Sequence, residues 1–155
     1  MCSEYSIRRA RGSDLDTLIA FAVQEARETE GCDPDPVGVR VGVKSGLEGS
    51  VPCRYWVAQS EEDLPVGSIS VVTEWSNFRG GYYWWVQSLF VVPEHRGTRL
   101  VDLLLNAVAD SARLAGALDL RLYVLQSNQR AVAAYNRCGF EVLPYSIMSR
   151  NLEKA

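Results

Sequence analysis

Two short segments of the chain carry residue types that suit anion binding and proton transfer. The first begins where Pro93 ends an apolar run, and a polar turn containing Arg96 and Gly97 follows it. Leucine and alanine residues then recur at three- and four-residue steps from Leu100 onward, which is the pattern of an amphipathic helix. Such a turn points backbone N–H groups and the positive end of a helix dipole at its occupant, so it predicts a phosphate site. The alternative is an ordinary strand-to-helix turn.

The second segment, 127–140, is expected to be a helix that ends at Gly139. Asn128 stands at its start, where an asparagine side chain usually caps a helix. Tyr135 shares a helix face with alanine residues, and this spacing permits two interpretations. Its hydroxyl is a proton donor for a leaving group within hydrogen-bond reach, or the residue is part of the core.

Together, VxPxxRG in the first segment and NxxAxxxYxxxGF in the second resemble the two signature segments of the GNAT family, the acetyl-CoA-dependent N-acetyltransferases. The resemblance follows the order of elements from Ile7 to Leu152 and is specific between Ser88 and Phe140. It implies an α/β GNAT fold, in which helices flank a central mixed, mostly antiparallel sheet. We expect one N-acetyltransferase domain over residues 1–155. In layout the chain is similar to diamine and thialysine N-acetyltransferases.

The resemblance also implies a donor site for acetyl-CoA as cosubstrate, without a metal. In the family, backbone groups of the fourth strand pair with the pantetheine arm, and here these are Leu89, Phe90 and Val91. Tyr135 would protonate the departing thiolate, and Asn128 would hydrogen-bond the donor. The following loop would hold the pyrophosphate, and it comprises Arg96, Gly97, Thr98, Arg99, Leu100, Val101 and Asp102.

This loop departs from the family pattern Arg/Gln-x-x-Gly-x-Gly/Ala. Arg99 and Val101 replace its two later glycines. Glycine lets backbone N–H groups approach a phosphate without an intervening Cβ, so the valine adds bulk there. Arg99 offers a charge-assisted contact in exchange, and the alternative is a solvated surface arginine.

The acceptor side is less defined. Where diamine and thialysine N-acetyltransferases carry an acidic pair, this chain has Gln87 and Ser88, which disfavours a polyamine substrate. Glu74 is the nearby carboxylate that we expect to act as general base through water, and the alternative is a solvated strand end. His95, the only histidine in the sequence, is not expected to take part in catalysis.

Strand alternation sorts the residues around Gln87 onto two faces. It predicts Trp85, Gln87 and Leu89 on one face, and Trp84, Val86 and Ser88 on the other. We therefore expect Trp75, Trp85 and Gln87 to line the acceptor site. Such a wall suits a partly apolar primary amine of a small molecule.

The expected reaction is direct transfer in a ternary complex, with the N–H near Leu89 stabilising the oxyanion. Two alternatives stay open. One is a weak or inactive acyl-CoA-binding module, which the replaced glycines favour. The other is a protein or peptide N-acetyltransferase.

Composition narrows the class of protein. Of 155 residues, 47% are hydrophobic and 23% charged, as in soluble globular proteins. The formal charge of −3 argues against a nucleic-acid partner, and no apolar run is long enough to span a membrane. The N-terminus lacks the apolar core of a signal peptide, and four cysteines without a CxxC motif suggest free thiols. We expect a cytoplasmic protein and, from the fold, a homodimer.

The elements that must position these residues follow from patterning. Ser13 opens a helix that ends near Gly31, with Gln24, Glu25 and other polar residues on its solvated face. Residues 37–50 are either a second helix or a loop. The expected strands are Tyr5–Ala10, Arg54–Gln59, Val66–Trp75, Tyr82–Val92, Leu118–Val124 and a terminal hairpin of Glu141–Leu143 with Ser146–Leu152.

Overall fold

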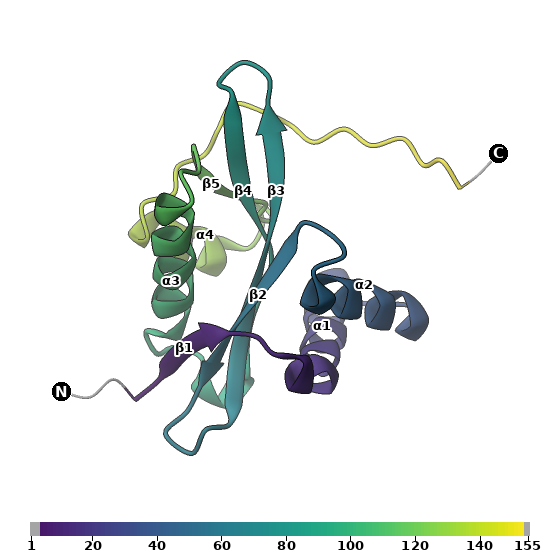
Figure 1. Cartoon of the computed structure of the whole chain (residues 1–155), viewed down its shortest axis with the longest axis vertical. Coiled ribbons are helices and arrows are strands. Elements are labelled where there is room, and N and C mark those ends of the chain that lie inside the picture. Colours follow the sequence, from purple (N-terminus) through teal and green to yellow (C-terminus); the bar gives the residue numbers. More distant parts are fainter. Residues whose placement is uncertain (1–3, 154–155) are drawn as a thin grey trace.

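The computed structural model, which describes residues 4–153, contains one five-stranded sheet with helices on both faces (Figure 1). The strands lie side by side in sequence order, antiparallel except for the last pair, which is parallel. This confirms the mixed, mostly antiparallel α/β architecture. The elements are β1 (Ser6–Arg9), α1 (Leu15–Glu30), α2 (Pro36–Glu48), β2 (Cys53–Gln59), β3 (Pro65–Ser76), β4 (Gly81–Val91), α3 (Leu100–Leu114), β5 (Leu120–Leu122) and α4 (Gln129–Arg137), with short 3-10 turns at Gly12–Asp14 and Pro93–His95.

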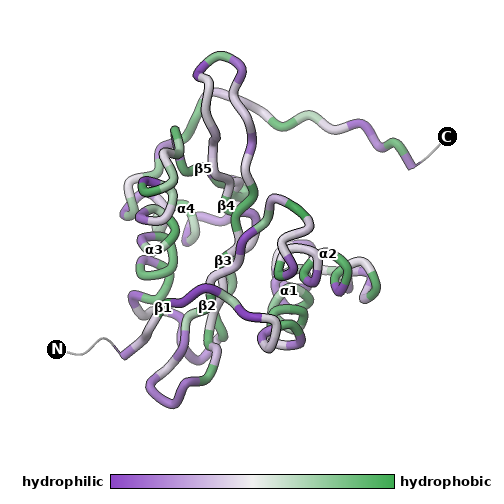
Figure 2. Tube along the Cα trace, in the orientation of Figure 1, coloured by the Kyte–Doolittle hydropathy of each residue, from purple (hydrophilic) through white to green (hydrophobic). Residues whose placement is uncertain are grey.

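Two apolar clusters hold the layers together. Helices α1 and α2 cover one face of the sheet and α3 and α4 the other (Figure 1). On the α3 face, Leu104 and Val108 are fully buried against Ile69 of β3. The green and purple stripes of α3 in Figure 2 show the amphipathic pattern that produces this contact. On the other face Phe21 of α1 packs on Phe90 of β4, with ring centroids 5.0 Å apart.

The segment that the sequence left open is helical. Pro36 begins α2, where its missing N–H removes no helical hydrogen bond. The Asp35 side chain caps the helix by accepting from the N–H groups of Val37 and Gly38. Gly49 ends it with a left-handed backbone, φ 73°. Helix α2 therefore provides a second wall beside α1.

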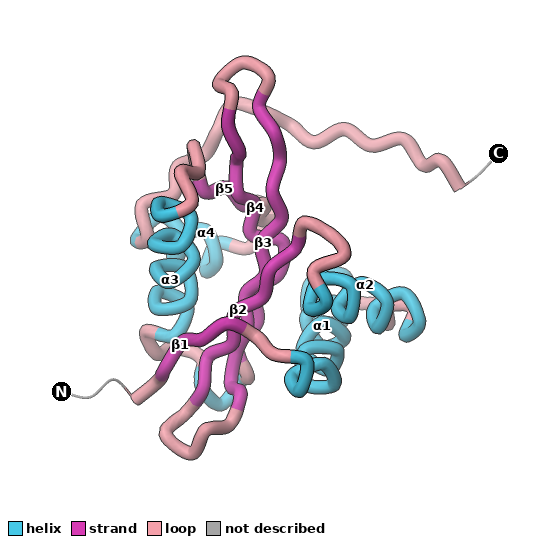
Figure 3. Tube along the Cα trace, viewed as in Figure 1, coloured by secondary structure: helices cyan, strands magenta, loops and turns pink. Residues whose placement is uncertain are grey.

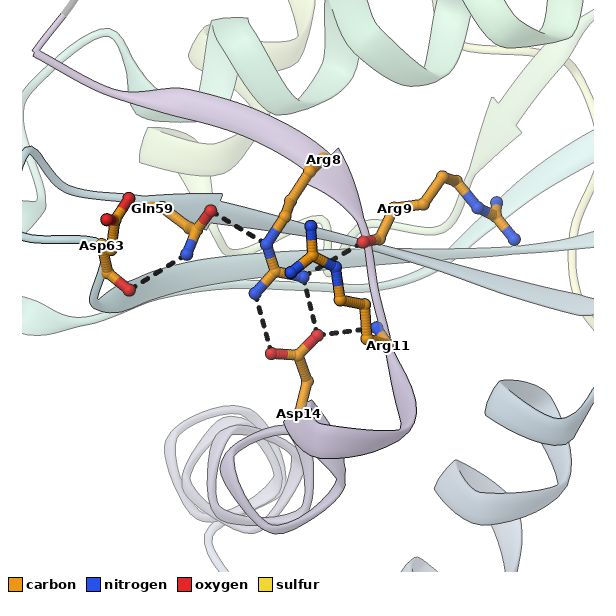
Figure 4. A network of polar contacts seen from close by, with 6 residues as sticks. All are labelled: Arg8, Arg9, Arg11, Asp14, Gln59 and Asp63. Atoms are coloured by element: carbon orange, nitrogen blue, oxygen red, sulfur yellow. Dashed lines mark hydrogen bonds and ion pairs between the residues drawn. The ribbon is translucent and has the colours of Figure 1, made fainter.

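A partly buried ion pair fixes the start of α1 to the sheet (Figure 4). Arg8 of β1 donates to both oxygens of Asp14, at 2.7 and 2.9 Å, and also to Gln59 of β2. The backbone N–H of Arg11 donates to the same carboxylate at 2.7 Å. The hydrogen bond from Arg8 is the largest influence on Asp14 and lowers its pKa below the usual value. The carboxylate thus holds the chain where β1 leads into α1.

A β-bulge in β4 changes which side chains point to each face of the sheet. Ser88 pairs with Ser70 of β3 and Val86 pairs with Val71, so Gln87 is an extra residue in β4. Since one inserted residue inverts the alternation, the predicted sorting onto two faces is wrong for Ser88 and Leu89, whereas Gln87 lies opposite Val86 as predicted. Leu89 packs with the α3-side cluster to which Val86 belongs, and Gln87 and Ser88 both face the α1–α2 side.

The predicted terminal hairpin is wrong. Residues 138–153 contain no strand, and beyond Phe140 the chain runs away from the body of the molecule (Figure 3). The two short apolar pieces around Pro144 have too few residues to bury each other as an isolated hairpin. Apolar side chains of this segment are exposed, namely Val142, Leu143, Tyr145, Ile147, Met148 and Leu152.

Candidate active site

Strand β5 is shorter than β4, so the second half of β4 has an open edge. Strand β5 pairs with β4 only from Trp84 to Val86, so residues 87–91 have no strand on that side. The N–H of Leu89 donates across this edge to Oε1 of Glu25 at 3.1 Å. The hydroxyl of Ser88 donates to the other oxygen of the same carboxylate. The Glu25 carboxylate is thus hydrogen-bonded to a backbone N–H on the open edge of β4.

Glu25 is a functional candidate that the polar pattern of α1 does not indicate. Its polar character predicts a place on the solvated face of α1, whereas its carboxylate accepts hydrogen bonds from Ser88 and Leu89 of the sheet. Helical spacing contained the signal, because Leu18, Ala22 and Glu25 follow one another at four- and three-residue steps and all line one pocket. Burial is the main influence on this carboxyl and raises its pKa, although the bonds from Ser88 and Leu89 oppose the shift.

The pocket beside Glu25 measures about 410 Å³ and lies between α1, α2 and the sheet. Its walls are mostly aliphatic, and among the described residues that line it Glu25 is the only acidic one. The polar contributors from β3 and β4 are Ser68, Ser70, Gln87 and Ser88. The other lining residues are Leu18, Ala22, Val39, Gly42, Val43, Val51, Pro52, Cys53, Tyr55 and Val72.

Tyr135 lies on the other side of the open edge. It comes from α4, packs against the α3-side cluster that includes Leu89, and meets Phe140 edge-on at 6.0 Å between ring centroids. Burial is the largest cause that raises the pKa of its hydroxyl, and the charge of Glu25 is the next. The phenol therefore stays protonated at neutral pH, and the negative charge of Glu25 contributes to this.

The loop before α3 exposes a row of backbone donors. Gly97 adopts a left-handed backbone, φ 78°, and Thr98 Oγ1 accepts from the N–H of Leu100 while donating to the His95 carbonyl. Several amides here have no hydrogen-bond partner among residues 4–153, and they belong to Gly97, Thr98, Arg99, Val101 and Asp102. Together with the helix dipole they form a site suited to a phosphate.

The two arginines of this loop have different surroundings. Arg96 donates to the Val91 carbonyl at 2.8 Å and to Glu28 at 2.8 and 3.0 Å, so its side chain joins the end of β4 to α1. Arg99 is exposed, and in the described part of the chain no carboxylate pairs with it. The Val101 side chain packs against the α3-side cluster and is partly buried there.

The placement of Asn128 agrees with helix capping. Its Oδ1 accepts from the N–H of Ala131 at 3.1 Å, and this bond satisfies a free donor in the first turn of α4. The side-chain N–H₂ group is exposed and remains able to donate.

Comparison with known proteins decides the family. The model of the acetyltransferase (GNAT) family matches residues 22–140. This chain belongs to the GNAT family. A possible acetyltransferase from Clostridium difficile 630 has a similar structure, with 30% identity and a TM-score of 0.87 over 97% of this chain and 99% of its own. No curated protein sequence matches the chain.

Other solved structures share the fold at lower identity. An integron cassette protein from the mobile metagenome of Cole Harbour Salt Marsh is 23% identical, with a TM-score of 0.82 over 94% of this chain and 90% of its own. The aminoglycoside N-acetyltransferase AAC(6')-Iy is 16% identical, with a TM-score of 0.80 over 96% and 99%, and was solved with the bisubstrate analogue CoA-S-monomethyl-acetylneamine. As a member of the family whose model it matches, the chain is an acetyltransferase, and this family uses acetyl-CoA. The finer likeness to diamine and thialysine N-acetyltransferases stays a prediction.

Within this GNAT domain, the structure separates the residues that were expected on the acceptor side. Glu74 is exposed and faces Tyr83 near the far end of the β3–β4 hairpin, about 20 Å along the strand from Leu89. Trp75 lies at the same end, edge-on to Tyr82. Trp85 stacks on Tyr123 at 4.6 Å and does not line the pocket. Of the expected acceptor residues, Gln87 lies in the pocket.

Two further features concern the described residues as a whole. None of the helices within residues 4–153 combines the length and apolarity that crossing a membrane requires. Over the same residues, no three histidine, cysteine, aspartate or glutamate side chains are arranged to hold a metal ion.

Proposed function

We propose that the protein transfers an acetyl group from acetyl-CoA to the primary amine of a small molecule by direct transfer in a ternary complex. One observation carries this proposal: β4 has an open edge at Leu89 and leads into the turn with free amides, and Tyr135 packs against the same cluster as Leu89. Such an edge accepts an extended chain as an added strand, and the adjacent amides accept an anion. These are the two features that a pantetheine arm and its diphosphate require.

The residues present fit the donor. Acetyl-CoA, when bound, supplies an acetyl thioester that an amine can attack. Leu89, Phe90 and Val91 would pair with its arm through backbone groups, while the amides from Gly97 to Asp102 and the Arg99 side chain would hold the phosphates. Arg96 supports this site from outside, since its side chain is occupied by Val91 and Glu28.

Two groups of the chain would act during the reaction. The Leu89 N–H would donate to the carbonyl oxygen as negative charge develops on it, a type of contact that often contributes most to acyl transfer. Tyr135 would give its proton to the departing sulfur, and its raised pKa keeps that proton in place until then.

Thiol release with a panel of amines tests the proposal. Tyr135→Phe should lower kcat about 10²-fold or more, because proton transfer is lost, with little change in the dissociation constant of acetyl-CoA. Tyr82→Phe, at the exposed far end of β4, is the matched control and should keep wild-type turnover. Tight binding of acetyl-CoA without thiol release on any amine would instead support a binding module. Acetylation of peptides in preference to small amines would support the protein-acetyltransferase alternative.

We also infer that two copies associate through the segment beyond Phe140. Its exposed apolar side chains, Tyr145, Ile147 and Met148 among them, are unfavourable in water. Strand β5 has an edge with no neighbouring strand in the described sheet, which an extended segment of a second copy could extend. Light scattering should show a dimer for the full chain and a monomer after deletion of residues 141–155. A monomeric full chain would refute this inference.

The location belongs to the proposal as well. Cys32, Cys53 and Cys138 are unpaired, and free thiols favour a reducing compartment such as the cytoplasm. Cell fractionation of the tagged full chain would test this.

A further inference from the structure

Glu25 occupies the backbone donor that the reaction needs. One carboxylate oxygen accepts from the Leu89 N–H at 3.1 Å and the other from the Ser88 hydroxyl. A carboxylate on this N–H prevents the same N–H from donating to the carbonyl oxygen of a bound thioester. Binding of acetyl-CoA therefore requires the Glu25 carboxylate to release the Leu89 N–H. Helix α1 keeps this carboxylate beside the pocket.

The pocket has room for an acceptor whose ammonium group could pair with the displaced carboxylate. Its walls from α1 and α2 are aliphatic, including Leu18, Val39 and Val43, and Glu25 is the single acidic group on its described lining. One acidic group among apolar walls matches one ammonium on an apolar body. Spermidine and aminoglycosides carry several ammonium groups, which such a pocket would have to desolvate without partners.

We propose that Glu25 binds the ammonium group of the acceptor and takes its proton, and that the acceptor is a compact monoamine with an apolar body. This inference deepens the proposed function and depends on it. Glu25 belongs to the catalytic groups in this scheme because it touches the reacting nitrogen.

The protons balance as follows. Glu25 takes one proton from the ammonium and later releases it to solvent. The nitrogen lone pair forms the C–N bond to the thioester carbonyl carbon, and the C–S bond breaks with its electron pair on sulfur. Tyr135 donates a proton to that sulfur, and the nitrogen's second proton restores the phenol. The products are an amide, coenzyme A as free thiol and one proton in solution.

The surroundings of Glu25 support a role as base. Burial raises its pKa, and Glu28 on the next turn of α1 adds to the rise. Glu28 is itself paired with Arg96. The other titratable groups that interact with Glu25 are the phenols of Tyr55 on β2 and Tyr135 on α4, both of which have raised pKa values. Both phenols stay neutral near pH 7. The ionisation of Glu25 should therefore control the acid limb of the pH–activity profile.

Two substitutions at Glu25 separate its roles. Glu25→Gln keeps the shape and removes the charge, so it should lower kcat/KM for 2-phenylethylamine about 10²-fold or more and abolish the acid limb of the pH profile. Glu25→Ala frees the Leu89 N–H, so calorimetry should show acetyl-CoA binding about tenfold more tightly while turnover is lost. A merely structural role would weaken both binding and turnover. Glu30→Gln, an exposed glutamate on the same helix, is the matched control.

The choice of amine tests the substrate class separately. Wild-type protein should acetylate 2-phenylethylamine with a kcat/KM at least about tenfold above those for spermidine and kanamycin. A preference for either polycation would overturn the monoamine assignment. Wild-type turnover and an intact acid limb in Glu25→Gln would overturn the role of Glu25.

Failure of this inference can be distinguished from failure of the proposed function. If wild-type protein neither binds acetyl-CoA nor releases thiol, the proposed function fails, and this inference fails with it. If wild-type protein turns over and Glu25→Gln does as well, the transferase assignment survives and only the assignment of Glu25 is refuted. Thermal denaturation of both variants checks that they are folded.

Discussion

Replacing Arg99 by alanine should change stability and donor binding in opposite directions. Arg99 immediately precedes α3, where the helix dipole presents positive charge, and no carboxylate pairs with it in the described residues. Its charge is therefore unfavourable in the free protein, although Asp102 in the first turn offsets part of this. The same charge becomes favourable when a diphosphate binds to the amides.

The magnitudes follow from exposure. A charge of the wrong sign at a helix end costs about 0.3–1 kcal/mol, so Arg99→Ala should raise Tm by about 1–3 °C. Arg99 is exposed, which limits its contact with phosphate to about 1 kcal/mol. The dissociation constant of acetyl-CoA should then rise about fivefold. The salt dependence of binding should also become weaker, because one cation has been removed from the phosphate site.

Calorimetric titration with acetyl-CoA at two salt concentrations measures both effects, and differential scanning calorimetry measures Tm. Arg113 provides the matched control, since it lies in the last turn of the same helix and pairs with Asp110. Arg113→Ala should leave the dissociation constant unchanged and lower Tm, because a cation suits that end of a helix. Unchanged acetyl-CoA affinity in Arg99→Ala would refute the role of Arg99 in phosphate binding.

Three further substitutions test the scaffold. Asp14→Asn should lower the free energy of unfolding by about 1.5–3 kcal/mol at pH 7, since it removes the charge that accepts hydrogen bonds from Arg8 and Arg11. Because the pKa of Asp14 is depressed, this stabilisation is present above the unfolded value of about 3.9 and fades as pH falls through the folded pKa, so urea unfolding should show a smaller difference at pH 3. Gly97→Ala should weaken acetyl-CoA binding in calorimetry, since φ 78° strains a side-chain-bearing residue by about 1 kcal/mol. Leu104→Ala should lower the unfolding free energy by about 2–5 kcal/mol in the same urea assay, and a loss below 1 kcal/mol would contradict its place in the core.

Local patterns in the sequence were sufficient for most of the fold. The amphipathic spacing after Leu100 and the turn at Gly97 predicted α3 and its loop, because helix periodicity and a left-handed glycine are properties of neighbouring residues. The strand patterns likewise located β2, β3 and β4 within one residue at each end. The two signature segments were sufficient to indicate the family.

The details of the acceptor side depended on contacts between distant residues. The bulge at Gln87 inverts the faces of β4, and it is visible only in the pairing of β4 with β3. Glu74 and Trp75 are close in sequence to the residues of interest, yet antiparallel pairing carries them to the far end of the hairpin.

The sequence by itself indicated α1, α3, α4, the strands from β2 to β4 and the turn at Gly97, since each depends on side chains a few positions apart. Only the tertiary structure decided which carboxylate meets the open edge of β4. Glu25 reaches Leu89 across 64 residues of chain, because α1 packs against that face of the sheet. A polar residue on a helix looks solvated until the partner that satisfies it has been placed, and that partner comes from the fold.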